Sequence, residues 1–151
     1  FAWLGGRPVD VEAWRQRAAS QGLQNLQVLG FVENRLIPAY QSAADVLLMP
    51  YERVITTSSG GNTADICSPM KMFEYMAAGR AILSSDLPVL REVLNNENAV
   101  LLPPEDPQAW VEALQRLSAD PDLRRRLGSC ARADVEQYTW QSRAEKCLRN
   151  F

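Results

Sequence analysis

The sequence contains no histidine, and this absence removes several kinds of active site at once. Ser-His-Asp and Cys-His nucleophiles, imidazole-ligated metals and acid–base catalysis by histidine all need that side chain. The cysteines, at positions 67, 130 and 147, are widely spaced and form no CxxC pair. This pattern argues against a disulfide framework or a zinc site and fits a reducing compartment. We therefore expect a cytoplasmic protein with no metal.

Long hydrophobic runs and blocks of basic residues are absent as well. No apolar run is long enough to cross a bilayer, and no signal-peptide pattern opens the chain. With 16 Lys and Arg against 18 Asp and Glu, the net charge is −2. Nucleic acid and anionic membranes are therefore poor candidates for the main partner. The glycine-rich phosphate loops GxGxxG and GxxxxGKS/T are also missing.

What is present is the composition of an ordinary soluble domain. Hydrophobic residues make up 46% and charged residues 23% of the 151 positions, enough for one domain with a substantial core. The chain opens without a methionine, directly on the apolar run from Phe1 to Leu4, followed by Gly5 and Gly6. That opening resembles a strand cut from something longer, so we expect a fragment rather than a processed N-terminus.

Short apolar runs alternate with helical patterns along the chain. Strands are expected at residues 1–4, 26–29, 45–49, 81–84 and 99–102, and helices at 9–19, 37–44, 68–79 and 88–94. Three amphipathic helices should follow, after a cap at Asp106, from about Asp122 and from Thr139, each lying on a core. The alternation predicts an α/β fold: a parallel sheet with helices on both faces and a helical C-terminal tail, in one domain over residues 1–151.

The sequence of residues 68–79 predicts a helix with recognisable signals at both ends. Ser68 is expected to be the N-cap, Pro69 the first helical residue and Gly79 the left-handed terminator. Most residues between them are apolar, so the helix should be largely buried with its methionines in the core. The only charged residues, Lys71 and Glu74, share a face near the helix start.

Ligands of parallel sheets bind at the carboxyl ends of the strands. In this chain those ends lead into residues 5–6, 30–34, 50–68 and 84–88, and the helix start at residue 68 meets the same edge. Its free N–H groups suit a phosphate, Lys71 could offset phosphate charge, and Glu74 suits the hydroxyls of a sugar. Other interpretations stay open: Lys71 and Glu74 as an ordinary surface pair, and Ser84 to Asp86 as a helix cap.

Residues 68–94, SPMKMFEYMAAGRAILSSDLPVLREVL, resemble the signature block of retaining family-4 (group 1) glycosyltransferases. Further matches follow in the family's order at residues 30–32, 37–40, 43–51, 98–104, 106 and 138–140, so the resemblance covers essentially the whole chain. It implies the GT-B architecture, in which two Rossmann-like domains face each other across a cleft. This chain resembles the C-terminal domain, which binds the nucleotide-sugar donor.

The resemblance also implies roles for individual residues. Glu74 matches the second Glu of the family's E-x7-E motif, which binds the ribose hydroxyls. The N–H groups of Met70 and Lys71 would meet the diphosphate, with Ser68 at the same helix start. Phe31 and Val32 match the segment that holds the nucleotide base.

The sequence departs from the family pattern just before this helix. Ile66 stands where the first Glu is expected, and Asp65 beside it could serve after a slip of one residue. We therefore take Glu74 and Asp65 as the catalytic candidates. The basic pair that normally clamps the diphosphate, and the acceptor domain, have no counterpart in these 151 residues.

The expected function is binding of a UDP- or GDP-linked sugar for retaining transfer to an acceptor hydroxyl in glycan biosynthesis, without a cofactor. The acceptor, a glycan, a lipid-linked molecule or a small molecule, would be bound by the N-terminal domain, so the fragment alone should be inactive. Peripheral attachment of the whole enzyme to a membrane stays open. The alternative is a non-catalytic nucleotide-binding or docking module. A receiver domain is excluded, because Gly5 and Gly6 stand where it needs acidic residues.

Overall fold

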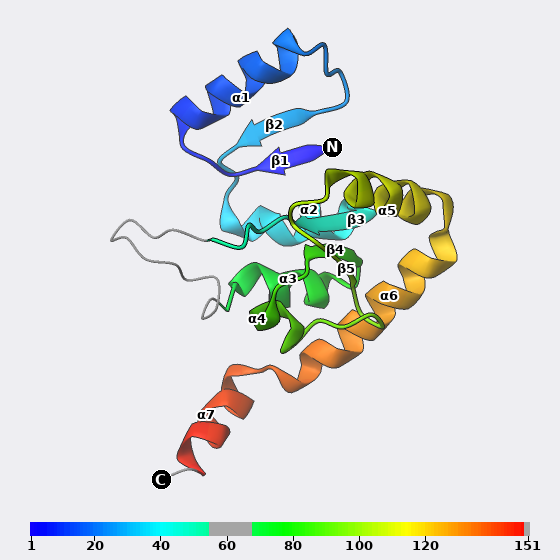
Figure 1. The fold of residues 1–151 in the computed structure, drawn as a ribbon. Coiled ribbons are helices and arrows are strands. Elements are labelled where there is room, and N and C mark those ends of the chain that lie inside the picture. Colours follow the sequence, from blue (N-terminus) through cyan, green and yellow to red (C-terminus); the bar gives the residue numbers. More distant parts are fainter. Residues whose placement is uncertain (55–67, 150–151) are drawn as a thin grey trace. The chain divides into compact units, whose positions relative to one another are not determined.

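The computed structural model describes residues 1–54 and 68–149 (Figure 1). The chain divides into two compact units, residues 1–40 and residues 41–151, called here the first and the second unit. Each is described by itself. Whether residues 1–151 act as one nucleotide-sugar-binding domain stays a prediction. Within the described residues, no helix combines the length and apolarity needed to cross a membrane.

The first unit is a β-α-β arrangement. Strands β1 (Ala2–Leu4) and β2 (Gln27–Gly30) are parallel, and helix α1 (Pro8–Ser20) connects them. Val11 and Ala18 of α1 are buried, as is Val28 of β2. A 3-10 turn, η1 (Asn34–Leu36), then leads into α2 (Ile37–Ala43).

The second unit is built on a three-stranded parallel sheet in the order β3-β4-β5. Its strands are β3 (Val46–Met49), β4 (Ala81–Ser85) and β5 (Val100–Leu102). The helices are α3 (Met70–Ala78), α4 (Pro88–Arg91), α5 (Pro107–Ala119), α6 (Pro121–Asp134) and α7 (Trp140–Leu148), with a 3-10 turn η2 (Val135–Gln137) before α7. Each expected element is present, with most ends shifted by one to three residues.

Strand alternation places a hydrophobic core on each face of this sheet. Ile82 packs with Met72 and Met76 of α3 and with Leu90 of α4. Leu83, on the opposite face, packs with residues of α5 and α6. Helices therefore cover both faces, and the predicted α/β class with a parallel sheet is confirmed.

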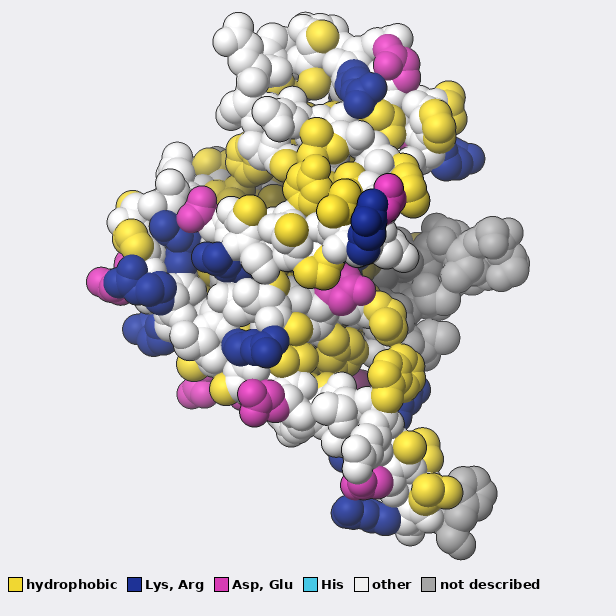
Figure 2. Space-filling model, turned by 180° about the vertical axis from the view of Figure 1, so that it is seen from behind, with side chains coloured by type: hydrophobic (Ala, Val, Ile, Leu, Met, Phe, Trp, Pro, Cys, Tyr) yellow, Lys and Arg dark blue, Asp and Glu magenta, His cyan; other side chains and the backbone are white. Residues whose placement is uncertain are grey.

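Three details of the helix predictions are wrong. Helix α3 begins at Met70, because the backbone of Pro69 is extended (ψ 123°), and Ser68 therefore makes no cap bond. The helix is also less buried than expected: only Met72 and Met76 are buried, and Met70 is 60% exposed. Third, α7 has no buried residue among those described, and Trp140 is 72% exposed. Its apolar side chains stand out in Figure 2, because no described element covers them.

Other predicted helix ends are confirmed. Gly79 terminates α3 in the left-handed conformation at φ 65°. Asp106 caps α5 by accepting a hydrogen bond from the Ala109 N–H, and Thr139 caps α7 by accepting one from the Ser142 N–H.

Helix α6 holds the end of α3 by a close backbone contact. A β-carbon added at Gly128 would lie 2.3 Å from the carbonyl oxygen of Gly79 and 2.8 Å from its carbonyl carbon. Four residues further along α6, Arg132 Nη1 donates a hydrogen bond of 2.6 Å to the carbonyl oxygen of Ala77. The orientation of α3 therefore depends on a glycine at position 128.

We predict that Gly128→Ala lowers the free energy of unfolding, by about 1–3 kcal/mol, because overpacking forces the backbone apart. Alanine stabilises a helix relative to glycine by about 1 kcal/mol. This gain offsets part of the cost of the clash, so the measured loss of unfolding free energy is smaller than the cost of the clash itself. Urea unfolding followed by circular dichroism measures it. Ser129→Ala, on the exposed neighbouring residue of α6, is the control, and equal stability of the two variants would contradict the contact.

Candidate functional site

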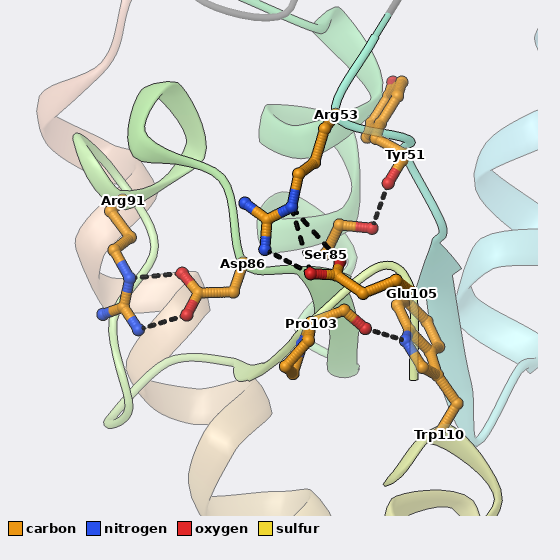
Figure 3. Close-up of polar contacts among 8 residues, drawn as sticks. All are labelled: Tyr51, Arg53, Ser85, Asp86, Arg91, Pro103, Glu105 and Trp110. Atoms are coloured by element: carbon orange, nitrogen blue, oxygen red, sulfur yellow. Dashed lines mark hydrogen bonds and ion pairs between the residues drawn. The ribbon is translucent and has the colours of Figure 1, made fainter. Parts of the chain in front are cut away.

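The carboxyl ends of β3, β4 and β5 meet at one edge of the sheet. In the parallel register Met49 lies beside Ser84, and Ser85 lies beside Leu102. The segments that follow these strands come together in Figure 3. Ser85 Oγ donates a hydrogen bond of 2.6 Å to the carbonyl oxygen of Tyr51, which ties β4 to the segment after β3. This is the edge at which parallel sheets bind ligands.

The start of α3 lies at this edge. The Lys71 ammonium sits over the ring of Tyr51, 5.6 Å from its centroid, within the range of a cation–π interaction. Helix α3 has nine residues, and no side chain among residues 1–54 and 68–149 caps it. Within the described residues the N–H groups of Met70 and Lys71 have no acceptor. The helix start therefore presents a lysine and unpaired N–H groups to an anion.

Glu74 lies one turn along α3 and has a neutral partner. Gln41 Nε2, on the buried side chain of α2, donates a hydrogen bond of 3.3 Å to Glu74 Oε2. The Glu74 carboxylate is exposed and accepts no hydrogen bond from a cation among the described residues. Burial, and to a smaller extent the charge of Glu74, raises the pKa of the neighbouring Tyr75. Glu74 therefore has oxygen lone pairs left for further donors.

The other predicted site residues are not joined to this edge by the structure. Phe31, 80% exposed, and Val32, half-buried, follow β2 and belong to the first unit, within which alone they are described. Asp65 and Ile66 lie outside the described residues. Ser68 is exposed. Of the predicted site residues, the structure thus places Lys71 and Glu74 of α3 at this edge. The roles of the other residues stay predictions.

Two ion pairs at the same edge were not foreseen. Arg53 forms a fork with Glu105, at 2.8 Å from Nη2 to Oε1 and 3.2 Å from Nε to each carboxylate oxygen. Arg91 forms a second fork with Asp86, which includes a bond of 2.8 Å from Nη2 to Oδ2. Asp86 thus pairs with Arg91 and does not cap α4. The Arg53–Glu105 pair links the segment after β3 to the segment after β5, as Figure 3 shows.

Both ion pairs lower the pKa of the carboxyl group that takes part in them. Hydrogen bonding from Arg53 lowers the pKa of Glu105, and hydrogen bonding from Arg91 lowers the pKa of Asp86, to which the charges of Arg91 and Arg53 contribute. A carboxyl group with a lower pKa in the folded state stabilises the fold above its unfolded pKa. That contribution is lost as pH falls through the folded value.

We predict that Glu105→Gln lowers the free energy of unfolding only slightly at neutral pH, because the pair is exposed. The stability of the variant should also fall less steeply than that of the parent as the pH is lowered. The variant and the parent should differ in urea midpoint at pH 7 and converge as pH falls below the ordinary glutamate value of 4.5. Urea unfolding at a series of pH values measures this. Glu97→Gln, on an exposed residue, should leave the profile unchanged, and a constant difference at every pH would contradict the assignment.

Two pockets lie at opposite ends of the strands. One, of about 310 Å³, lies at the carboxyl edge and is lined by Pro50, Tyr51, Glu52, Ser85, Pro104, Pro107 and Trp110. The other, of about 260 Å³, lies where β3 and β4 begin and is lined by Asp45, Gly79, Arg80, Ala81, Pro121, Arg124 and Arg125.

Two of the three arginines that line the second pocket, Arg124 and Arg125, have structural partners. Arg124 Nη1 donates to the carbonyl oxygen of Ser118 at 2.9 Å, and Arg125 pairs with Asp122. Figure 2 shows the basic side chains on the flank of α5 and α6 with acidic ones among them. Among residues 1–54 and 68–149, no group of three or more His, Cys, Asp or Glu could hold a metal ion.

Solved structures of glycosyltransferases share this fold. Sucrose-phosphate synthase from Thermosynechococcus elongatus matches with a TM-score of 0.77 and 23% identity, covering 99% of this chain and 37% of that one. HepE from Anabaena, solved in complex with UDP-glucose, matches with a TM-score of 0.74 and 19% identity, covering 99% of this chain and 40% of its own. The fold is therefore that of one part of a GT-B glycosyltransferase.

The sequence comparisons define the family. The model of the glycosyl transferases group 1 family matches residues 1–120. D-inositol 3-phosphate glycosyltransferase of Xylanimonas cellulosilytica is 31% identical over 145 residues, which is 95% of this chain and 32% of that protein. The chain thus belongs to the group 1 glycosyltransferases, as its signature block predicted. It spans about one third of the length of that relative.

Proposed function

We propose that this chain binds the nucleoside-diphosphate sugar of a retaining glycosyltransferase, which transfers the sugar to an acceptor hydroxyl. The observation that carries the proposal is that Lys71, Glu74 and the start of α3, which no described side chain caps, lie at the carboxyl edge of the sheet. Family membership supports the reaction class. The retaining outcome rests on the resemblance of residues 68–94 to the family's signature block.

Each of these groups has a distinct task in the proposal. The N–H groups of Met70 and Lys71 and the Lys71 ammonium stabilise the negative charge of the departing diphosphate. Glu74 accepts hydrogen bonds from the ribose hydroxyls, and its neutral bond from Gln41 orients the carboxylate without neutralising it. The proposed reaction uses no metal and no histidine.

Several roles are proposed on the resemblance alone. Phe31 and Val32 hold the base, which belongs to UDP or GDP, and Asp65 supplies the carboxylate missing at position 66. HepE was solved with UDP-glucose, which favours UDP as the first ligand to try. The acceptor, a glycan, a lipid-linked molecule or a small molecule, is bound by a domain outside these residues, so this chain alone should not transfer sugar. We place the whole enzyme in the cytoplasm, in glycan biosynthesis.

We predict that Glu74→Gln weakens UDP or GDP binding by about tenfold or more, because hydrogen bonds to a charged acceptor are strong. Calorimetric titration of the 151-residue chain with each nucleotide measures the affinity, and circular dichroism checks the fold. Glu97→Gln is the matched control on an exposed glutamate. If Glu74→Gln binds UDP and GDP as tightly as the parent does, the proposed role of Glu74 is wrong.

A second prediction separates the phosphate contact from the sugar contact. Lys71→Met should weaken UDP or GDP and leave the binding of uridine or guanosine unchanged, since only the diphosphate meets the ammonium. The loss should shrink at high salt, which screens charge. Lys146→Met, on the chain's other lysine, lies in exposed α7 and serves as control. Equal losses for nucleoside and nucleotide would contradict the assignment.

The rival function is a non-catalytic docking module of the same fold. This chain matches about one third of the length of a relative, and a docking module would give such a match as readily as an enzyme domain. The same titrations decide, because a pure docking module produces no heat with UDP or GDP.

A further inference from the structure

The Lys71 ammonium is placed by an aromatic ring and not by a carboxylate. It lies over the ring of Tyr51, 5.6 Å from the centroid, although Glu74 stands three residues further along the same helix. Residues three apart on a helix share a face, where a lysine and a glutamate attract each other. Among the described residues Lys71 nevertheless forms no ion pair, neither with Glu74 nor with Glu52. Glu74 accepts a hydrogen bond from Gln41 instead, so each charge has a neutral partner.

The ring of Tyr51 is a fixed support for the lysine. The Tyr51 N–H donates a hydrogen bond of 3.1 Å to the carbonyl oxygen of Met49, and the Tyr51 carbonyl oxygen accepts one of 2.6 Å from Ser85 Oγ (Figure 3). The side chain is half-buried and packs against the core that contains Met72 and Ile82. Lysine, by contrast, has a flexible four-carbon stem. A ring held in this way lowers the cost of ordering that stem when an anion binds.

The neighbouring cations at this edge are arranged in the opposite way. Arg53 forms its fork with the carboxylate of Glu105. Arg91 forms one with the carboxylate of Asp86, so both guanidinium charges are compensated. Of these three cations, only Lys71 has an uncharged partner among the described residues. An anion that reaches this edge is therefore attracted most strongly by Lys71.

We propose that Tyr51 is a positioning residue, whose ring holds the Lys71 ammonium at the start of α3 and away from Glu74. The charge of the ammonium then stays available to a phosphate group. Tyr51 acts through Lys71, and the attraction comes from the face of the ring, so this role needs an aromatic residue and not the hydroxyl. The inference rests on the proposed function for the identity of the phosphate, which is the diphosphate of a nucleotide sugar.

The test compares Tyr51→Leu, which removes the ring face, with Tyr51→Phe, which keeps it. Calorimetry of the 151-residue chain with inorganic pyrophosphate, UDP, GDP and uridine measures the affinities, and circular dichroism checks the fold. Tyr51→Leu should weaken the binding of pyrophosphate, UDP and GDP about threefold or more and leave that of uridine unchanged. Tyr51→Phe should match the parent. In the Lys71→Met background Tyr51→Leu should cause no further loss, because the ring acts through the ammonium.

Tyr138→Leu is the matched control. The ring of Tyr138 contacts that of Phe73 in α3, with 5.4 Å between the centroids. The substitution therefore removes an aromatic packing contact of the same helix without touching Lys71. A merely structural role of Tyr51 would give the two leucine variants the same effect, and that effect would persist in the Lys71→Met background.

NMR of the parent chain tests the contact without any ligand or substitution. The ring current of Tyr51 should move the ε-methylene protons of Lys71 upfield of those of Lys146, the chain's other lysine, which lies in α7. Lys146→Met assigns the two signals. Tyr51→Phe should keep the upfield shift and Tyr51→Leu should remove it. Equal positions of the two lysine signals in the parent would overturn the inference.

The binding data separate this inference from the proposed function. UDP and GDP binding that Tyr51→Leu leaves unchanged, or that Tyr51→Phe weakens as much as Tyr51→Leu does, rejects the role of Tyr51 alone. So does an equal loss from Tyr51→Leu with and without Lys71. Pyrophosphate binding that depends on the ring, with no binding of UDP or GDP, supports the role of Tyr51 and rejects only the proposed function. A parent chain that binds none of the phosphate compounds overturns both.

Discussion

All five residues of β4 are buried, and a parallel strand of this kind needs a layer of helices on each face. Ile82 points to the side of α3 and α4, and Leu83 to the side of α5 and α6. Helix α3 covers its face with Met72 and Met76 and then leads directly into β4. Its first turn must therefore lie at the edge where β3 ends. The placement of Lys71 and Glu74 follows from the requirement to cover β4.

Local sequence patterns were enough to predict the elements of this arrangement. Apolar runs marked the strands, Asp106 and Thr139 marked helix starts, and Gly79 marked the end of α3. The start of α3 could not be read in the same way. Proline is compatible both with the first helical residue and with the extended residue before it, and Pro69 takes the extended form. Amphipathicity likewise predicted a buried face for α7, although the sequence pattern says nothing about which element would cover it.

The candidate site was predictable only where it is local. Lys71 and Glu74 lie on one helix, so their spacing placed them on one face. Arg53 and Glu105 are 52 residues apart in the chain, and no pattern in either segment indicates the partner. Trp110 lies in the helix predicted after Asp106, but the bond from its indole to the carbonyl oxygen of Pro103 depends on the turn between β5 and α5. Long-range contacts of this kind follow from the order of the strands.

The carboxyl edge of the second unit is divided between two kinds of hydrogen-bonding surface. The start of α3 offers a lysine and N–H groups that have no acceptor among the described residues, which suit an anion. The pocket beside Trp110 offers a carboxylate, while its Ser85 hydroxyl and Trp110 indole donate to backbone carbonyls. A nucleoside-diphosphate sugar carries both an anionic group and a ring rich in hydroxyl donors. Tyr51 belongs to both surfaces, because the Lys71 ammonium lies over its ring and the same residue lines the pocket.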